Sequence, residues 1–185
     1  QVGCWAARTM AAQGAKVVAV SDIGGGVYNP AGINLADMDA SRGPGGLVGG
    51  YKGGEAASND DILALNCDVL IPAAIENVIT PKNAGNVKAK IVVEGANSPV
   101  THDADEVLNR NGVLVVPDIL ANAGGVVVSY FEWAQNIQVF RWDLERVNHE
   151  LDTIMRRAYD VTRETQQNEH VTMREAAYSV AVARV

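Results

Sequence analysis

The sequence has little of what marks several common protein classes. It holds only two cysteines, Cys4 and Cys67, and three widely separated histidines, which predict neither a disulfide framework nor a metal site. It has no run of 18 apolar residues and no secretory-type leader pattern. The formal net charge of −7 comes without a basic stripe, which argues against nucleic acid as a partner. We therefore expect a cytoplasmic globular protein that binds neither membranes nor nucleic acid.

The sequence does show alternating strand and helix patterns, which are typical of an α/β protein. Runs rich in valine and isoleucine are apolar on successive residues, as in strands that are covered on both faces of a parallel sheet. These runs span residues 15–22, 67–74, 89–97 and 112–119. Between them lie residues that commonly start helices, namely Ser58, Thr80 with Pro81, and Thr101. The predicted fold is a Rossmann-like, doubly wound and mostly parallel sheet with C-terminal helices.

Two regions depart from this alternation. Residues 22–55 hold 11 of the 18 glycines with little periodicity, so we expect a long mobile insertion with one short helix near residues 34–40. After residue 120 the strand pattern ends. A long helix is predicted from Asp143, and a last helix starts at a capping box formed by Thr172 and Glu175.

The first 25 residues match part of a dinucleotide-binding unit. Gly3 stands where the last glycine of a G-x-G-x-x-G fingerprint opens a helix, and Asp22 ends a predicted strand 19 residues later. Asp22 is predicted to accept both hydroxyls of the adenosine ribose and to repel a 2′-phosphate, which favours NAD over NADP. Ile23, the next residue, offers no donor to a phosphate, although the glycine-rich loop leaves Arg42 or Lys52 as alternatives that would allow NADP. An aspartate at this point is also a common turn or capping residue. The unit begins with its helix, so we expect the first central strand to be missing from this sequence.

Three blocks in the middle of the sequence carry a specific resemblance. They read CDVLIPAAIENVIT, KAKIVVEGANSPVT and GVLVVPDILANAGGVVVSYFEWAQN. In this order and spacing they resemble the cofactor domain of the amino-acid dehydrogenases of the glutamate, leucine, phenylalanine and valine group. The resemblance runs through the whole sequence. It implies reversible, NAD(P)-dependent oxidative deamination of an L-amino acid to a 2-oxo acid and ammonia.

The resemblance also implies cofactor contacts. Ala73 and Ala74 would line the adenosine side of the cofactor, or would otherwise be two core alanines. Asn97 would lie beside the nicotinamide ribose, with a turn as its alternative role. Asn122 would present its amide to the nicotinamide carboxamide, and as an alternative or in addition it would be a helix N-cap. Glu94 is expected to be a solvated charge at a strand end and is given no role.

Two further residues are implied to contact the substrate. Val126 would touch the amino acid, and Ser129, one turn later, would donate to the distal carboxylate of glutamate. A hydroxyl facing an aliphatic substrate would be left unpaired at a cost of about 1–3 kcal/mol, so a serine favours L-glutamate over leucine, valine or phenylalanine. An incidental helix serine is the alternative. The implied products are 2-oxoglutarate and ammonia.

No catalytic residue is predicted within this sequence. In the family, lysines and an aspartate of a separate substrate domain perform the acid–base chemistry, and no counterpart is present here. We expect residues 1–140 to form the dinucleotide-binding domain and residues 141–185 to form helices that pack back toward the substrate domain. A homo-oligomer, commonly a hexamer, is implied through the missing domain. A non-catalytic nucleotide-binding module and a dehydrogenase of an apolar L-amino acid are the alternative functions.

Overall fold

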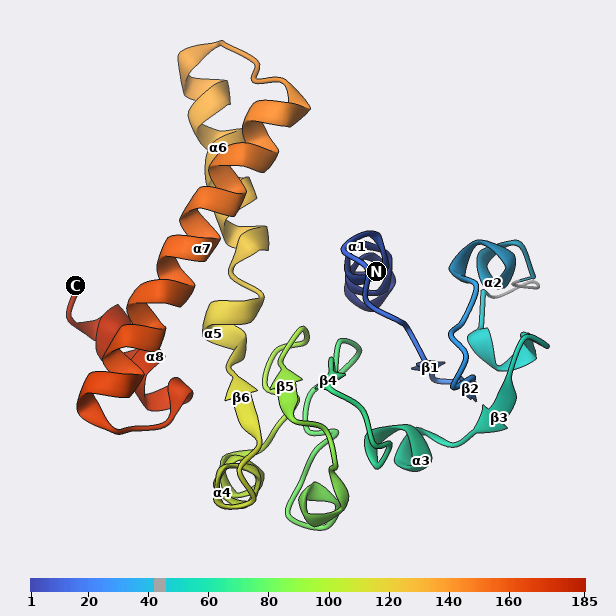
Figure 1. Cartoon of the computed structure of the whole chain (residues 1–185). Helices are drawn as coiled ribbons and strands as arrows, with labels where there is room; N and C mark the ends of the chain where they lie inside the picture. Colours follow the sequence, from blue (N-terminus) through green and yellow to red (C-terminus); the bar gives the residue numbers. More distant parts are fainter. Residues whose placement is uncertain (42–45) are drawn as a thin grey trace.

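The computed structural model describes residues 1–41 and 46–185, and it confirms the predicted α/β class (Figure 1). The described strands form two three-stranded sheets, one parallel and one antiparallel. Helices occupy the segments between the strands of the parallel sheet and the whole of the C-terminal third. Within the described ranges, no helix combines the length and the apolar character that crossing a membrane would require.

The main hydrophobic core packs against the parallel sheet. This sheet is formed by β4 (Val69–Leu70), β5 (Ile91–Val93) and β6 (Leu114–Val116), in that order. The 3-10 helix η2 (Ala84–Asn86) and the helix α4 (His102–Arg110) cover it, and their buried side chains pack against the sheet. Thr101 caps α4 as predicted, whereas the Thr80–Pro81 start is followed only by a turn and η2. The central strand β5 is entirely apolar, and Val92 in its middle is fully buried while Ile91 and Val93 are partly buried.

The glycine-rich region is more regular than predicted. The chain runs from α1 (Val2–Ala12) through Gly14, which has a φ of 90°, into β1 (Ala19–Asp22). β1 pairs antiparallel with β2 (Gly25–Tyr28), which pairs antiparallel with β3 (Glu55–Ala57). The sequence therefore predicted the short helix of this region but missed the strands β2 and β3. Residues 42–45 lie outside the described residues.

Glycine is needed for this small sheet because its strands lie very close to other groups. A Cβ added at Gly26 would overlap the Ile62 side chain and would lie 2.8 Å from Cβ of Ser21. Sequence periodicity cannot reveal such a strand, because its glycines contribute no side chains to a pattern. The short helix α2 (Leu35–Ser41) agrees with the prediction, and Met38 on it joins Val27 in a second core. The segments η1 (Val48–Gly50) and α3 (Asn59–Leu63) complete this part, and Ser58 caps α3 as predicted.

Four helices follow the last strand. They are α5 (Asp118–Ala121), α6 (Gly124–Gln138), α7 (Leu144–Glu169) and α8 (Met173–Val182). α7 runs beside α6, and α8 returns to pack against β6 and α5 (Figure 1). Asp143 caps α7, and the predicted capping box of Thr172 with Glu175 starts α8. The chain therefore brings its last helix back onto the parallel sheet.

A leucine pair offers a test of where the core lies. Leu108 of α4 is fully buried, whereas Leu144 of α7 is 74% exposed. We expect Leu108→Ala to lower the free energy of unfolding by about 3 kcal/mol, because it removes buried methyl groups and leaves a cavity. The matched Leu144→Ala change should cost less than about 0.5 kcal/mol. Urea denaturation of both variants measures the difference, and equal losses would contradict the described core.

Candidate functional site

The carboxyl ends of the parallel strands lie together at one edge of their sheet. β4 is followed by the residues up to Ala74, β5 by the turn that carries Asn97, and β6 by Asp118 at the start of α5. The turn after β5 is tied to the end of β4, because the amides of Gly95 and Ala96 both donate to the carbonyl oxygen of Pro72 at 3.0 Å. Ligands of open α/β sheets bind at such an edge.

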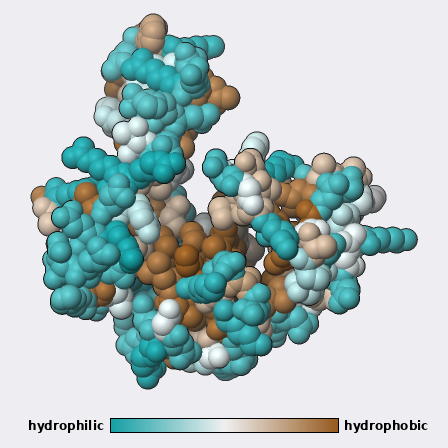
Figure 2. Space-filling model, in the orientation of Figure 1, coloured by the Kyte–Doolittle hydropathy of each residue, from teal (hydrophilic) through white to brown (hydrophobic). Residues whose placement is uncertain are grey.

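The start of α1 lies against this edge. A Cβ placed on Gly3 would be 3.5 Å from Cβ of Ala73, and one placed on Gly95 would be 3.1 Å from the same atom. Ala73 is partly buried here and Ala74 is exposed. The small residues Gly3, Ala73 and Gly95 therefore allow the helix start and two strand ends to approach closely. In the view of Figure 2, apolar residues gather in a hollow between α1 and α5.

The structure brings Asn97 and Asn122 together. Asn122 Nδ2 donates to Oδ1 of Asn97 at 2.7 Å, and it lies 3.4 Å from the carbonyl oxygen of Ala96. Asn97 is exposed and Asn122 is partly buried. Among the described residues, no hydrogen bond involves Asn97 Nδ2 or Asn122 Oδ1. The pair therefore presents one donor and one acceptor to a ligand.

Asn122 does not cap α6 as the sequence suggested. It is the C-cap of the short helix α5, and Ala123 stands at the N-cap of α6. The difference arises because Pro117 and Asp118 start an additional helical turn that the sequence pattern did not predict. The side chain of Asn122 is thus left for contacts with the turn after β5.

Asp22 lies at the end of β1, where its carboxylate is held by two backbone amides. Gly24 donates to Oδ1 at 2.8 Å and Val48 donates to Oδ2 at 2.7 Å. Asp22 is therefore a turn residue in this structure, which was the alternative that the sequence left open. Each carboxylate oxygen has a second lone pair, so the same group can still accept from a ligand. A role in the turn and a role in binding are compatible.

The neighbours of Asp22 bear on cofactor choice. Ile23 is 94% exposed and presents a bare apolar side chain beside the carboxylate. Lys52 is exposed on the loop before β3, and Arg42 lies outside the described residues. Gly24 and Gly49 pack backbone against backbone, since a Cβ on Gly49 would lie 2.7 Å from the carbonyl oxygen of Gly24. This close approach is what places the Val48 amide on Asp22.

The predicted substrate residues lie on the first turns of α6. Val126 is 75% exposed, and Ser129 is exposed with its hydroxyl donating to the carbonyl oxygen of Gly125 at 3.0 Å. α6 begins two residues after Asn122, so these side chains follow the asparagine pair along the chain. Ser129 can donate to a ligand only by rotating away from this intrahelical bond.

Sequence reasoning missed a buried ionic cluster next to the turn that carries Asn97. Glu94, expected to be a solvated charge, is fully buried at the end of β5. Its carboxylate accepts from Arg174 of α8, with Nη2 2.6 Å from Oε1 and Nη1 3.2 Å from Oε2. Burial raises the pKa of Glu94, and the hydrogen bonds and charge of Arg174 offset part of this effect. The only sequence signal was an acidic residue directly after an apolar strand, which is equally typical of a surface turn.

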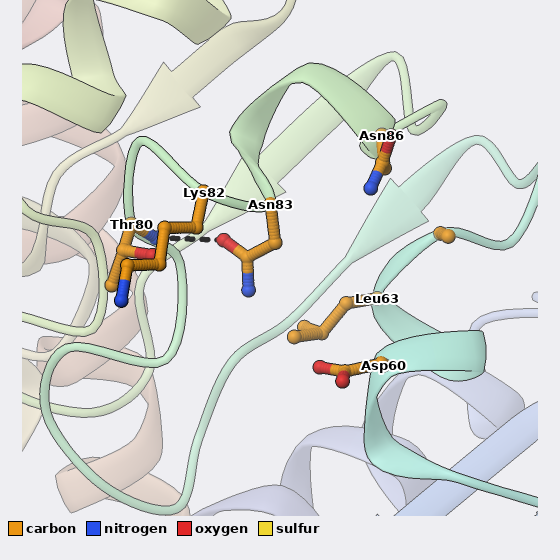
Figure 3. A pocket seen from close by; sticks show the side chains of 7 residues that line it. Asp60, Leu63, Thr80, Lys82, Asn83 and Asn86 are labelled. Atoms are coloured by element: carbon orange, nitrogen blue, oxygen red, sulfur yellow. Dashed lines mark hydrogen bonds between the residues drawn. The ribbon is translucent and has the colours of Figure 1, made fainter.

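A separate pocket lies away from this edge. It has a volume of about 370 Å³ between α3 and the turn that leads into η2, with Asp60 and Leu63 on one wall and Thr80, Lys82 and Asn83 on the other (Figure 3). Asn83 accepts the amide of Thr80 and so shapes its own wall of the pocket. None of the predicted cofactor or substrate residues lines this pocket. We therefore place the candidate site at the carboxyl edge of the parallel sheet.

A parallel sheet with a helix start and two small-residue turns at its carboxyl edge defines an α/β domain of the Rossmann type. Comparison with known proteins narrows this class. The chain belongs to the glutamate/leucine/phenylalanine/valine dehydrogenase family, whose model matches residues 1–185. This finding confirms the resemblance that the three sequence blocks carry.

Known relatives are glutamate dehydrogenases. The chain is 49% identical over 185 residues to the glutamate dehydrogenase of Thermotoga maritima, and it covers 44% of that protein. Among solved structures, the hetero-hexameric glutamate dehydrogenase of Thermus thermophilus, in a leucine-bound form, superposes with a TM-score of 0.89 at 32% identity. The match covers 98% of this chain and 43% of that one.

A second solved structure gives a similar result. The glutamate dehydrogenase of Peptoniphilus asaccharolyticus superposes with a TM-score of 0.80 at 32% identity, and the match covers 98% of this chain and 42% of that one. The chain therefore spans less than half the length of each of these relatives.

The contacts of Asp22 lead to a test by hydrogen exchange. In Asp22→Ala, the amides of Gly24 and Val48 lose their acceptor, so we expect the Val48 amide to exchange at least about tenfold faster. Asp22→Asn keeps one acceptor oxygen and should give a smaller increase. Asp103→Ala, at an exposed position on α4, is the control. An unchanged Val48 rate in Asp22→Ala would show that the carboxylate does not hold this loop.

Proposed function

We propose that this chain is the cofactor-binding part of an NAD-dependent glutamate dehydrogenase, which converts L-glutamate reversibly to 2-oxoglutarate and ammonia. The observation that carries the proposal is the convergence of Gly3, Ala73, Asn97 and Asn122 at one sheet edge in a member of this family. When bound, the nicotinamide cofactor supplies the hydride acceptor or donor. The residues of this chain bind and orient it.

The nicotinamide end of the cofactor fits the asparagine pair. A carboxamide has one acceptor oxygen and one NH₂ donor, and Asn97 Nδ2 and Asn122 Oδ1 offer the complementary donor and acceptor. Gly3 and Ala73 leave no large side chain at the start of α1, which suits a pyrophosphate that must approach the backbone. Ala74, exposed beside Ala73, belongs to the adenosine side.

The preference for NAD rests on Asp22. Its carboxylate is fixed by two amides, so it cannot easily turn away from a 2′-phosphate, and it retains lone pairs for the two ribose hydroxyls. Ile23 offers the phosphate no donor and presents an apolar surface to the adenine. NADP would require a cation from elsewhere, and Lys52 and Arg42 are the candidates that the sequence contains.

The choice of glutamate rests on Ser129 together with the relatives. A hydroxyl on α6 can donate to the distal carboxylate of glutamate, whereas Val126 contacts the aliphatic part of the substrate. The acid–base residues are proposed to come from a substrate domain, with residues 1–140 as the cofactor domain and residues 141–185 packing toward the cleft. A cytoplasmic homo-hexamer completes the proposal.

Two other functions remain to be separated by experiment. A non-catalytic nucleotide-binding module would bind NADH but show no turnover in the complete gene product that carries this sequence. A dehydrogenase of an apolar L-amino acid would turn over leucine, valine or phenylalanine in preference to glutamate. Purification of the complete gene product and measurement of NAD reduction with these four amino acids decides among the three functions.

Cofactor choice gives a direct prediction. We expect NADH to bind the complete gene product at least about tenfold more tightly than NADPH, because Asp22 repels the 2′-phosphate. Asp22→Ser should weaken NADH binding and strengthen NADPH binding, so that the ratio approaches one. Asp37→Ser, on α2, is the matched control. Calorimetric titration measures both affinities, and tighter NADPH binding by the unaltered protein would refute the NAD preference.

Substrate choice gives a second prediction. Ser129→Ala should lower kcat/KM for glutamate by roughly 10- to 100-fold, because a hydrogen bond to a charged group is lost. Activity toward leucine should stay the same or rise. Ser179→Ala, on α8, serves as the control serine. Glutamate activity that is undiminished in Ser129→Ala would remove the argument for glutamate from this residue.

A further inference from the structure

Among the described residues, the buried carboxylate of Glu94 accepts hydrogen bonds from two residues, and both are distant in the sequence. Besides the two bonds from Arg174, it accepts the backbone amide of Asp118 at 2.7 Å. Glu94 directly follows the central strand β5, Asp118 starts α5, and Arg174 lies in the first turn of α8. The carboxylate therefore joins three elements at one point. Because its side chain is fully buried, Glu94 itself cannot contact a ligand.

The Arg174 guanidinium has further acidic neighbours. Nη2 donates to Oδ1 of Asp105 at 3.3 Å, and Nη1 lies 3.8 Å from Oδ1 of Asp118. Nε lies 3.2 Å from Oδ2 of Asp105, an ion-pair distance at which the angle does not give a hydrogen bond. The side chain of Arg174 is only 15% exposed, so one cation compensates three carboxylates in a largely dry place. A buried carboxylate that loses its cation is strongly unfavourable.

Glu94, Asp105, Asp118 and Arg174 form one ionic cluster, and Asp118 connects it to the candidate cofactor residues. The amide of Ser98 donates to Oδ2 of Asp118 at 2.8 Å, and Ser98 directly follows Asn97. The short helix that Asp118 starts ends at Asn122. The turn after β5 and the helix α5 are therefore fixed to each other at one end by this cluster and at the other end by the bond between Asn97 and Asn122.

We propose that Arg174 is a positioning residue for the nicotinamide end of the cofactor site. It holds Glu94 and Asp118, and these fix the two segments that carry Asn97 and Asn122. No atom of Arg174 is assigned to the cofactor, so the effect is transmitted through the neighbouring segments. The inference rests on the proposed function, because it needs a nicotinamide cofactor at this edge. Through Arg174, the helix α8 then helps to hold the nicotinamide end of the cofactor site in place.

The adenosine side of the site does not depend on this cluster. Asp22 ends β1, and its two amide partners lie in the turn between β1 and β2 and in η1. ADP-ribose contains the adenosine and both phosphates but no nicotinamide. Comparison of NADH with ADP-ribose therefore separates an effect on the nicotinamide end from a general loss of folded protein.

The main test is Arg174→Lys in the complete gene product. Lysine keeps the charge but loses the planar fork that binds Glu94 through two bonds. We expect NADH to bind on the order of tenfold more weakly, while ADP-ribose affinity changes by less than about twofold. Arg156→Lys is the matched control, because Arg156 forms an exposed ion pair with Asp152 within α7. It should change neither affinity.

Glu94→Gln is the second variant, and it tests the positioning role if Arg174→Lys does not fold. Glutamine has the same shape and can still accept the Asp118 amide, but it weakens the pairing with Arg174. We expect a smaller loss of NADH affinity, again without a change for ADP-ribose. Calorimetry gives both affinities, and near-ultraviolet circular dichroism confirms that each variant is folded.

The outcomes separate the two proposals. If the unaltered protein binds neither NADH nor ADP-ribose, the proposed function is wrong. If it binds both, and the folded Arg174 and Glu94 variants bind NADH as the unaltered protein does, the positioning role is wrong and the proposed function stands. Equal losses for NADH and ADP-ribose would also overturn the positioning role, because they indicate a general structural defect.

Discussion

A fully buried carboxylate must receive compensation from the rest of the protein, and at Glu94 this requirement organises the carboxyl edge of the parallel sheet. The compensation comes from Arg174, which is 80 residues further along the chain. Small buried residues of α8, Ala176 and Ala177, are consistent with the close packing of this helix against β6 and α5. The long helices α6 and α7 are the connection that returns the chain to this point.

The electrostatics of the cluster explain why it fixes geometry more than it stabilises the fold. Burial by itself would lower the pKa of Arg174, yet the bonds to Glu94 and Asp105 raise it overall. Burial raises the pKa of Glu94 in spite of the arginine. Desolvation and attraction largely offset each other in such a pair, so its net stabilisation is small while the loss of either partner is costly. The orientation of the segments it joins is therefore strongly determined.

Different interactions hold the two ends of the proposed cofactor site. On the adenosine side, Asp22 is oriented by the amide of Gly24, in the turn between β1 and β2, and by the amide of Val48, in η1. On the nicotinamide side, ionic and amide contacts hold Asn97 and Asn122. The helix α1 connects the ends, because its start contacts Ala73 and the chain then continues into β1. A substitution that disturbs one end of the site can therefore leave the contacts at the other end unchanged.

The sequence by itself determined the α/β class, the three strands of the parallel sheet, the caps at Ser58, Thr101, Asp143 and Thr172, and the family, because these depend on local pattern and on residue order. The run at residues 15–22, predicted as a covered parallel strand, instead forms β1 of the antiparallel sheet and is only partly buried. The sequence did not determine the glycine-rich sheet, the turn of α5, or the burial of Glu94. Close backbone approach at Gly26 leaves no periodic signal in the sequence. An acidic residue after a strand gives the same sequence pattern whether its side chain is solvated or is buried and paired with an arginine such as Arg174. Only the tertiary structure decided these features, because each depends on a partner that is remote in sequence or on a side chain that glycine lacks.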